Sequence, residues 1–544
     1  MSDGSVVIRN ARVFDGRSLL PGADTVAVAK GRISAVGMWS EVRSQITASA
    51  EDVDAGGALI LPSFTDAHVH PAQAGLELLD CDLSGARSQG EVLDLVRDYA
   101  SKHPDQPWIL GAGWQTVQFG RGGPRASQLD EIAPGRPIVL TDAGHHATWM
   151  SSTALQLLGI TASTPDPVDG RIDRDANGQP SGVVHEGAME IGREIIPVPS
   201  PDRIADGLLE AQRTLFSVGV TGWQDAIVGD YAGSLDSTAG YHTAYQRGTF
   251  QARTTAALWL DRSASERNPR DVAEELLARR RHFESLETAG QLTAPAVKVM
   301  LDGVVEARTA AMKAPYTDAP SFPGHFDTER LGSIAIELVR VGFQLHFHAI
   351  GDAALEQALD LVEATASVAE RRHHVAHLQI VDPADIPRMA RLGVTANLQM
   401  LWACNDEQNL AVCRPALGED RYLAQQFLFN SFHRAGVPLA AGSDWPVTTP
   451  NPWQAIAVGV TRVLPGSSAE PLAPSEALPL HVALSAYTRG SALTVGDTEG
   501  GRIGVGARAD LVQLDRDPFE LPPSELHTVK TIGTWASGRR VFGR

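Results

Sequence analysis

Two histidines separated by one residue, His68 and His70, end the segment Leu61-Pro-Ser-Phe-Thr-Asp-Ala-His-Val-His70. The apolar run that begins at Ala58 predicts a short strand leading to them. Because successive side chains of a strand point to opposite faces, both imidazoles lie on the same side and can bind one cation. A His-x-His pair also arises by chance in a long chain, so a metal site requires further ligand-type residues elsewhere.

The elements that would position these histidines follow from the rest of the chain. From Gly219 onward, short apolar strands alternate with helical stretches, which is typical of parallel βα units. The first predicted strand comprises residues 58–70. The other predicted strands are 219–225, 252–258, 296–301, 343–348, 374–380, 394–399 and 437–444. The predicted helices include 272–289, 328–340, 352–364 and 422–434. Eight such units predict an α/β fold, a (β/α)8 TIM barrel.

Six ligand-type residues fall at or beyond the C-terminal ends of these strands. They are His68 and His70 on the first strand, Lys298 on the fourth, His348 on the fifth, His377 on the sixth and Asp444 on the eighth. The C-terminal face of a barrel holds its active site, so we expect the six side chains to converge. Nitrogen and oxygen donors without thiolate suit zinc, manganese or iron, and zinc is the default ion for hydrolysis.

The remaining segments predict two further units. Both ends of the chain are rich in short strands, so residues 1–57 together with 490–544 are expected to form a composite β-sandwich. The barrel then comprises residues 58–74 and 207–489. Residues 75–206, inserted after the first strand, are too many for a loop and predict a subdomain that covers the mouth of the barrel as a lid.

Composition excludes several classes of partner. The 544 residues carry a net charge of −19 without a basic block, which argues against nucleic acid and anionic membranes. Three cysteines without a Cys-x-x-Cys pair support neither a disulfide framework nor a thiolate zinc site. No targeting or membrane-spanning segment is evident, so we expect a cytoplasmic protein acting on a small molecule. The oligomeric state stays open, a homo-oligomer included.

Several motifs besides these ligands carry a family resemblance over nearly the whole length. The chain resembles the amidohydrolase superfamily, and within it the group of YtcJ-like proteins and N-substituted formamide deformylases. The motifs that match are Gly111-Ala-Gly-Trp114, Leu129-Asp-Glu-Ile-Ala-Pro134, Gly219-Val-Thr, Lys298 ahead of Asp302-Gly303, Arg308-Thr-Ala-Ala, His348-Ala-Ile-Gly-Asp352, His377-Leu-Gln, Gly442-Ser-Asp444 and Gly504-Val-Gly-Ala-Arg-Ala-Asp-Leu-Val512.

The resemblance implies a centre for one or two divalent ions, zinc by preference. His68 and His70 would hold a buried ion together with Asp444. His348 and His377 would hold a more exposed second ion. Lys298 would bridge the two after carboxylation of its amine by carbon dioxide, which makes it an anionic oxygen ligand. The alternative for Lys298 is a salt-bridging lysine under the rim of the barrel.

The reaction that the resemblance implies is hydrolysis of a C–N amide-type bond by a metal-activated hydroxide. Asp444 would take the proton and deliver it to the leaving amine. The expected substrate is a small N-substituted amide, which could be formamide-, amide- or carbamate-like and aromatic. An alternative with the same metal site is hydrolytic deamination of a ring. A non-catalytic barrel scaffold is disfavoured, because such a protein should have lost ligands that are all present.

Further residues are candidates for contacting the substrate. His146, in Ala143-Gly-His-His-Ala147, is a second catalytic candidate that could hydrogen-bond the substrate carbonyl, and its alternative is a satisfied interior histidine. Trp114, Trp402 and Trp445 could form an aromatic wall of the substrate site. Arg308 is a candidate substrate contact, with a structural ion pair as its alternative.

Three histidines near the predicted ligands are expected to be structural. His346 shares a face with His348 but lies one layer deeper, so we expect it to pack inside the barrel. His374 has the opposite parity from His377, and His373 comes too early on its strand to reach the mouth.

Overall fold

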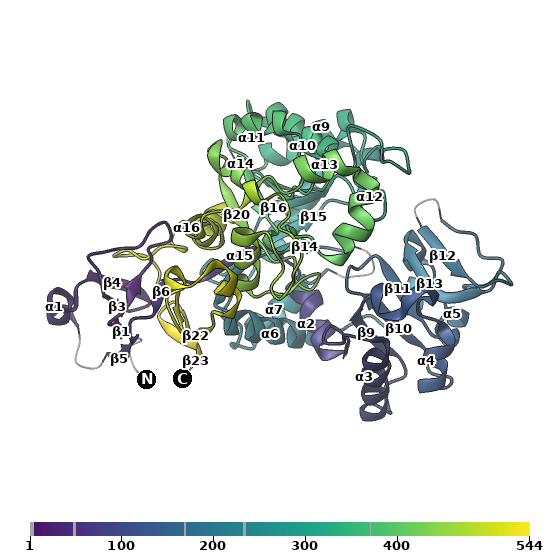
Figure 1. Cartoon of the computed structure of the whole chain (residues 1–544), viewed down its shortest axis with the longest axis horizontal. Coiled ribbons are helices and arrows are strands. Elements are labelled where there is room, and N and C mark those ends of the chain that lie inside the picture. The colour runs from purple at the N-terminus through teal and green to yellow at the C-terminus, as the bar shows by residue number, and fades with distance from the viewer. Residues whose placement is uncertain (1–4, 47–49, 168–169, 232–235, 370, 544) are drawn as a thin grey trace.

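An eight-stranded parallel sheet forms the centre of the molecule (Figure 1). The computed structural model describes residues 5–46, 50–167, 170–231, 236–369 and 371–543. Each strand of this sheet pairs with the next strand along the chain, as in a (β/α)8 barrel. The strands are β7 (Phe64–Val69), β14 (Val220–Val228), β15 (Arg253–Trp259), β16 (Leu292–Met300), β17 (Gln344–Ala349), β18 (His374–His377), β19 (Thr395–Leu398) and β20 (Leu439–Ala441).

The first and last strands close the barrel through hydrogen bonds beyond the ends of the strand ladders. Asp444 N donates to His68 O at 2.8 Å, and His70 N donates to Trp445 O at 2.9 Å. From the neighbouring strand, the side chain of Asn397 donates to Ala67 O at 2.9 Å. The predicted α/β barrel is therefore confirmed as a nearly closed ring whose seam lies at the predicted metal ligands.

Helices cover the outside of the strands, which explains why the strands are almost continuously apolar. They include α6 (Pro201–Ser217), α8 (Pro269–Phe283), α9 (Thr328–Arg340), α10 (Asp352–Thr365), α11 (Ile386–Leu392) and α15 (Pro452–Thr461). Side chains of Ser200, Asn268 and Asp327 cap three of these helices by accepting a backbone N–H. None of the described helices combines the length and the apolar character needed to cross a bilayer.

One predicted helix and one predicted strand are divided in the structure. The helix expected over residues 422–434 consists of α13 (Glu419–Ala424) and α14 (Phe429–Arg434). Between them the backbone bonds to the segment after β18, with Phe427 N donating to Gln379 O. The strand expected over residues 58–70 is also divided, into β6 (Leu59–Pro62) and β7, with only Ser63 between them.

The two ends of the chain supply two packed sheets at one end of the molecule, where both termini lie (Figure 1). A four-stranded sheet contains β1 (Val6–Arg9), β3 (Thr25–Ala29), β4 (Arg32–Gly37) and β5 (Glu51–Asp54), and β5 runs parallel to β1. A five-stranded sheet contains β2 (Arg12–Val13), β6, β21 (Leu511–Leu514), β22 (Thr531–Ala536) and β23 (Arg539–Gly543). Ile8, Val26, Ile60, Leu511 and Trp535 belong to the apolar core that the two sheets share.

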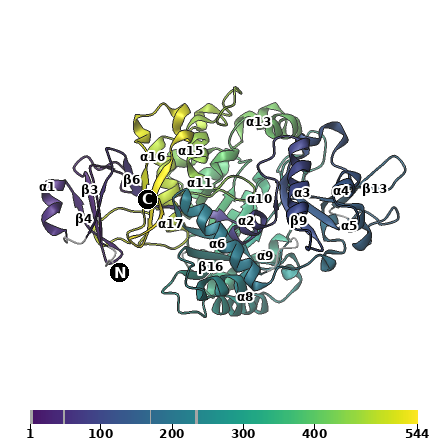
Figure 2. The ribbon, with the colours of Figure 1, turned by 90° about the horizontal axis from the view of Figure 1, so that it is seen from below.

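The segment between β7 and β14 folds around a separate sheet at the opposite end of the molecule (Figure 2). This inserted sheet has the order β12-β13-β11-β10-β9-β8, and α3 (Gln89–Lys102), α4 (Ala126–Ile132) and α5 (Ser152–Leu157) accompany it. It has its own apolar clusters, apart from that of the barrel. Its strands are β8 (Cys81–Asp82), β9 (Ile109–Trp114), β10 (Ile138–Asp142), β11 (Ala147–Met150), β12 (Gly170–Arg174) and β13 (Pro180–Glu186).

Helix α2 (Pro71–Leu79) leads from the paired histidines into this insert and crosses α6 at two glycines. A Cβ atom on Gly75 would lie 1.9 Å from the backbone oxygen of Gly207, so the two helix backbones are in direct contact. Only glycine permits this distance, and the position of α2 directly after His70 depends on it.

We therefore expect Gly75→Ala to lower the midpoint of thermal unfolding by several degrees, because overpacking against backbone costs about 3 kcal/mol. Gly85→Ala is the matched control, since a Cβ there meets nothing within 4 Å. Differential scanning calorimetry of both variants checks the expectation. Equal midpoints for the two variants would contradict it.

Candidate metal centre

Three ligand atoms meet where the barrel closes. His68 and His70 stand at the end of β7, and Asp444 follows β20. Asp444 Oδ1 lies 3.2 Å from His68 Nε2 and 3.0 Å from His70 Nε2. Tetrahedral ligands with bonds of about 2.1 Å are separated by about 3.4 Å, so these atoms are spaced as ligands of one small divalent ion.

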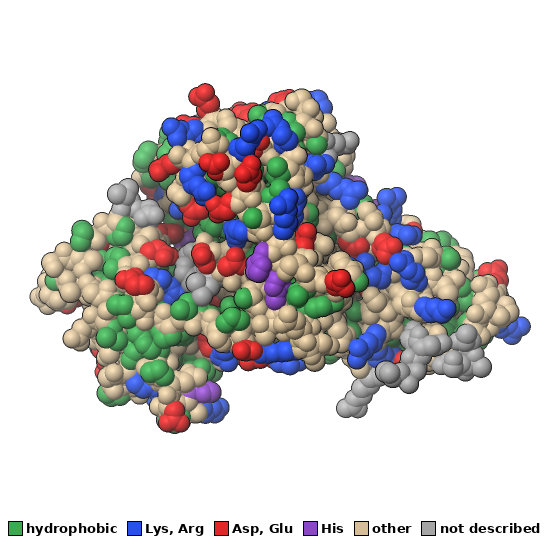
Figure 3. All heavy atoms as spheres, turned by 180° about the vertical axis from the view of Figure 1, so that it is seen from behind, with side chains coloured by type: hydrophobic (Ala, Val, Ile, Leu, Met, Phe, Trp, Pro, Cys, Tyr) green, Lys and Arg blue, Asp and Glu red, His purple; other side chains and the backbone are tan. Residues whose placement is uncertain are grey.

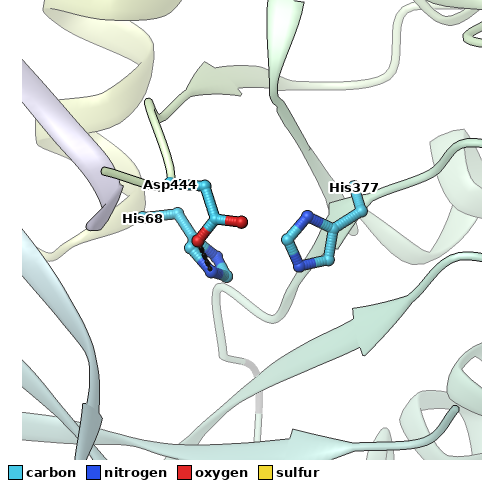
Figure 4. Close-up of side chains that lie close together, drawn as sticks. All are labelled: His68, His377 and Asp444. Atoms are coloured by element: carbon cyan, nitrogen blue, oxygen red, sulfur yellow. Dashed lines mark ion pairs between the residues drawn. The ribbon is translucent and has the colours of Figure 1, made fainter. Parts of the chain in front are cut away.

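His377, at the end of β18, completes this group from across the barrel (Figure 4). Ligand atoms of His68, His377 and Asp444 all lie within 4.8 Å of one another, and all three side chains are buried. Nδ1 of His377 is buried and has no hydrogen-bond partner. This is unfavourable unless an ion or a water molecule binds the nitrogen. The ring of His377 stacks on Trp402 with centroids 5.1 Å apart and planes 2° apart.

Lys298 and His348 reach the same centre from β16 and β17. The amine Nζ of Lys298 lies 3.5 Å from His68 Nε2, and the side chain is fully buried. The rings of His348 and His377 have centroids 4.4 Å apart. The structure thus gathers all six predicted ligand-type residues at the C-terminal ends of the strands, as the barrel geometry requires.

Burial sets the charges of the group. It lowers the pKa of His68 to about 3, with a further contribution from the charge of Lys298. It also lowers the pKa of His348, and that of His377 well below the ordinary value. Burial alone would raise the pKa of Asp444, but electrostatic attraction and a hydrogen bond to His68, a hydrogen bond to His70 and attraction to His377 hold it well below the usual range. At neutral pH His68, His348 and His377 are therefore neutral imidazoles and Asp444 is a carboxylate, the forms that bind cations.

A second carboxylate, Asp66, locks the backbone at the seam. It is fully buried and accepts hydrogen bonds from His68 N at 3.1 Å and Ser443 N at 3.0 Å, and burial raises its pKa to about 7. A Cβ on Gly442 would lie 2.6 Å from His68 N, so glycine is required for this approach. The backbone of Asp444, which follows β20, has φ 58°, and this conformation changes the direction of its side chain.

The supporting residues of the other ligands escaped prediction. Asp302 Oδ1 lies 3.1 Å from His348 Nδ1, and the same carboxylate accepts the backbone N–H groups of Ile350 and Gly351. Gln399 Oε1 accepts His377 N at 2.7 Å. The position of Asp302, four residues after Lys298 in a matching motif, was the available signal for its role.

His346 and His374 lie inside the barrel beneath the ligands. His346 Nε2 is 2.9 Å from His68 Nδ1, and its ring lies against that of His374 with centroids 4.1 Å apart. His374 was expected on the opposite side from His377, and this is wrong. The alternation fails because β18 ends at His377, whose φ of 79° turns the backbone.

His146 and Trp445 do not belong to the ligand group. His146 is in the turn between β10 and β11 of the insert, and its Nδ1 is 2.9 Å from Glu186 Oε1. Burial lowers the pKa of His146, but the hydrogen bond and charge of Glu186 outweigh this, so the net pKa is raised. Trp445 is buried next to Asp444, and its carbonyl accepts His70 N.

Two predicted substrate contacts are not brought to the centre. Trp114 is 1% exposed in the core of the insert, where it packs on Phe119 and Trp149 and donates Nε1–H to Leu140 O. Arg308 forms an ion pair with Asp318 and donates to two backbone carbonyls, which is the structural alternative considered for it. The prediction for Trp114 is therefore corrected, because its side chain fills a core, whereas the ion pair of Arg308 favours the structural alternative and its substrate contact stays a prediction.

Comparison with known sequences agrees with this geometry. The model of the amidohydrolase family matches residues 51–542. YtcJ of Bacillus subtilis (strain 168), whose name assigns it to the amidohydrolases, is 29% identical over 533 residues, 95% of this chain and 96% of that protein. The N-substituted formamide deformylase of Arthrobacter pascens is 28% identical over 566 residues, 99% of this chain and 98% of that enzyme.

Solved structures share the fold. A metal-dependent hydrolase from Pyrococcus horikoshii OT3 superposes with a TM-score of 0.76 and 23% identity, covering 95% of this chain and 99% of its own. A second metal-dependent hydrolase, from Pyrococcus furiosus, gives a TM-score of 0.73. With a family model that spans most of the chain and a buried group of His, Asp and Lys ligands at the mouth of the barrel, this protein belongs to the amidohydrolase family and is a metal-dependent hydrolase.

Proposed function

We propose that this enzyme hydrolyses the C–N bond of a small N-substituted amide, formamide-, amide- or carbamate-like, with aromatic substituents among those it accepts. The observation that carries the proposal is the buried carboxylate of Asp444 held between His68 and His70 and close to Lys298. The relative named N-substituted formamide deformylase supports the substrate class.

The donor set fits one or two zinc ions. His68, His70 and Asp444 would hold the first, and His348 with His377 the second. A bound divalent ion supplies a nucleophilic water at neutral pH and polarises the amide carbonyl. The chain's own residues then have to place the ions, hold the substrate and move the protons.

Lys298 would join the two ions as a carboxylated lysine. Burial lowers the pKa of its amine to about 7, so a large share of the side chain is uncharged near neutral pH. The neutral Nζ forms a bond to the carbon of carbon dioxide and releases one proton, which leaves a carbamate anion. Carboxylation thus replaces the amine, which repels metal ions when it is protonated, by an anionic carbamate that binds them.

Asp444 would move the proton. Its Oδ1 faces both His68 and His70, whereas Oδ2 makes no hydrogen bond within the described part of the chain. Its low pKa keeps the carboxylate ionised and ready to accept a proton from the attacking water. Protonated Oδ2 would then deliver the proton to the leaving amine.

We expect the metal-loaded enzyme to release an organic amine and a carboxylate from a panel of N-substituted formamides and amides, as followed by mass spectrometry. Asp444→Asn should lower kcat by at least about 100-fold with metal still bound, because the proton carrier is lost. Asp202→Asn, at an exposed ion pair with Arg247, is the control. Ammonia as the product would indicate deamination instead, and near-normal turnover of Asp444→Asn would exclude the proton-transfer role.

Carboxylation of Lys298 predicts a requirement for bicarbonate. Apo-protein reloaded with zinc should retain more metal when bicarbonate is present, and 13C-labelled bicarbonate should give one carbamate signal by NMR. Lys298→Gln should lose both effects because it has no amine. Metal retention that is independent of bicarbonate would contradict the carbamate.

His346 is expected to fix the ring of His68 for metal binding. For Nε2 of His68 to present its lone pair to an ion, Nδ1 must carry the proton and donate it to His346 Nε2, 2.9 Å away. Loss of this acceptor in His346→Phe should weaken zinc binding by about 10- to 100-fold, measured by competition with a chelator.

A side-chain amide can also accept this proton, so His346→Gln should recover part of the affinity lost in His346→Phe. His282→Gln, on the exposed face of α8, is the surface control. Equal affinities of His346→Phe and the wild type would show that His346 only fills space.

A further inference from the structure

An arginine without a carboxylate partner stands at the mouth of the barrel. Arg262 begins a short 3-10 helix, η5 (Arg262–Glu266), after β15. Its Nη2 lies 3.3 Å from His325 Nε2 and 3.8 Å from Met300 Sδ. The hydroxyl of Tyr231 donates to the same sulfur at 3.3 Å. The guanidinium is therefore held by Met300, the last residue of β16, and by His325 of the loop after it, and Tyr231 holds Met300 in turn.

The position of Met300 places this group relative to the metal ligands. Met300 ends β16 two residues after Lys298, so both side chains point into the barrel, and Met300 lies about 7 Å nearer the mouth. Its backbone is in register with that of His348. Arg262, which contacts the sulfur of Met300, therefore lies on the open side of the ligand group.

Nothing in the described structure neutralises this charge. His325 and Met300 are its hydrogen-bond acceptors, and both are uncharged, since burial and the charge of Arg262 lower the pKa of His325 to about 3. Nε of Arg262 is buried without a hydrogen-bond partner. A buried N–H donor of a guanidinium that has no acceptor is unfavourable, so the site favours an incoming acceptor.

Three carboxylates of the surrounding loops are engaged elsewhere. Asp261, the preceding residue, accepts the N–H and hydroxyl of Ser263, and Glu186 bonds to His146. Glu306 accepts the thiol hydrogen of Cys413. Many other arginines pair with carboxylates, as Arg279 of α8 does with Asp236, and basic and acidic side chains are intermixed on the face shown in Figure 3. Arg262 differs from these by its neutral surroundings.

We propose that Arg262 determines substrate specificity by binding a carboxylate, and that the substrate is an amide carrying a carboxylate at the end remote from the scissile bond. A guanidinium offers paired N–H donors that match the two oxygens of a carboxylate. This inference rests on the proposed amide hydrolysis and narrows its substrate class. It also assigns the two ends of the substrate: the amide toward Lys298 and Asp444, and the acid toward Arg262 and His325.

The test uses the zinc-loaded enzyme and matched pairs of N-formyl compounds, each an amino carboxylic acid and its neutral primary amide, in a series of increasing chain length. The wild-type enzyme should hydrolyse each acid with a higher kcat/KM than its neutral amide, and this preference should be greatest at one chain length. Arg262→Gln should lower the ratio of kcat/KM for acid over neutral amide by about 10- to 150-fold, since a hydrogen bond to a charged group contributes about 1.5–3 kcal/mol. Arg262→Lys keeps the positive charge but lacks the paired N–H donors. Its ratio of kcat/KM should therefore fall between those of the wild type and Arg262→Gln.

Arg330→Gln is the matched control, because this exposed arginine also contacts η5, but through the backbone oxygen of Ser265. It should leave the ratio unchanged. An equal preference of the wild type for acid and amide, or an unchanged ratio in Arg262→Gln, overturns the inference while leaving amide hydrolysis intact.

If no compound in the series is hydrolysed, the proposed function fails and calorimetric binding decides the role of Arg262. Tighter binding of the acid than of the neutral amide, lost in Arg262→Gln, supports the carboxylate subsite. Equal binding of both compounds overturns it.

Discussion

The contact between Asp444 and the paired histidines is the constraint on which the rest of the structure depends. It is a backbone contact as well as a side-chain contact, because Asp444 N donates to His68 O and His70 N donates to Trp445 O. The barrel therefore closes with the same residues that gather the ligands. A distortion of the seam would alter both the ring of strands and the spacing of the donor atoms, so stability and metal binding are coupled here.

Buried polar groups make this seam specific. Asp66 receives backbone N–H groups from both sides, and Asn397 donates to Ala67 O from β19. Each is completely enclosed, where an unpaired polar group would be costly, so only one register of the first and last strands satisfies them. Beneath them, His346 and His374 fill the barrel with imidazole rings instead of aliphatic side chains, which extends the polar support of His68 one layer deeper.

Sequence patterns predicted the barrel and its ligand group because both depend on local regularities. Apolar strands recur between helices, and each ligand stands at a strand end. What escaped prediction depends on tertiary contacts. Trp114 looks the same in sequence whether it fills a core or lines a site, the helix around Phe427 breaks to bond with Gln379, and His377 interrupts the alternation by a positive φ. The significance of Arg262 lies in the absence of a carboxylate partner among the described residues, which no sequence pattern reveals.

The passage of β6 directly into β7 determines when the active centre can be assembled. His70 and Asp444 are 374 positions apart, and β6, which precedes the strand leading to the histidines, is held by β21, because Leu61 pairs with Val512. A ribosome makes the first ligands early, yet the partners that hold them emerge near the end of synthesis. Until then β7 can pair with β14 but lacks its contacts with the residues after β20, so the centre cannot become active piece by piece.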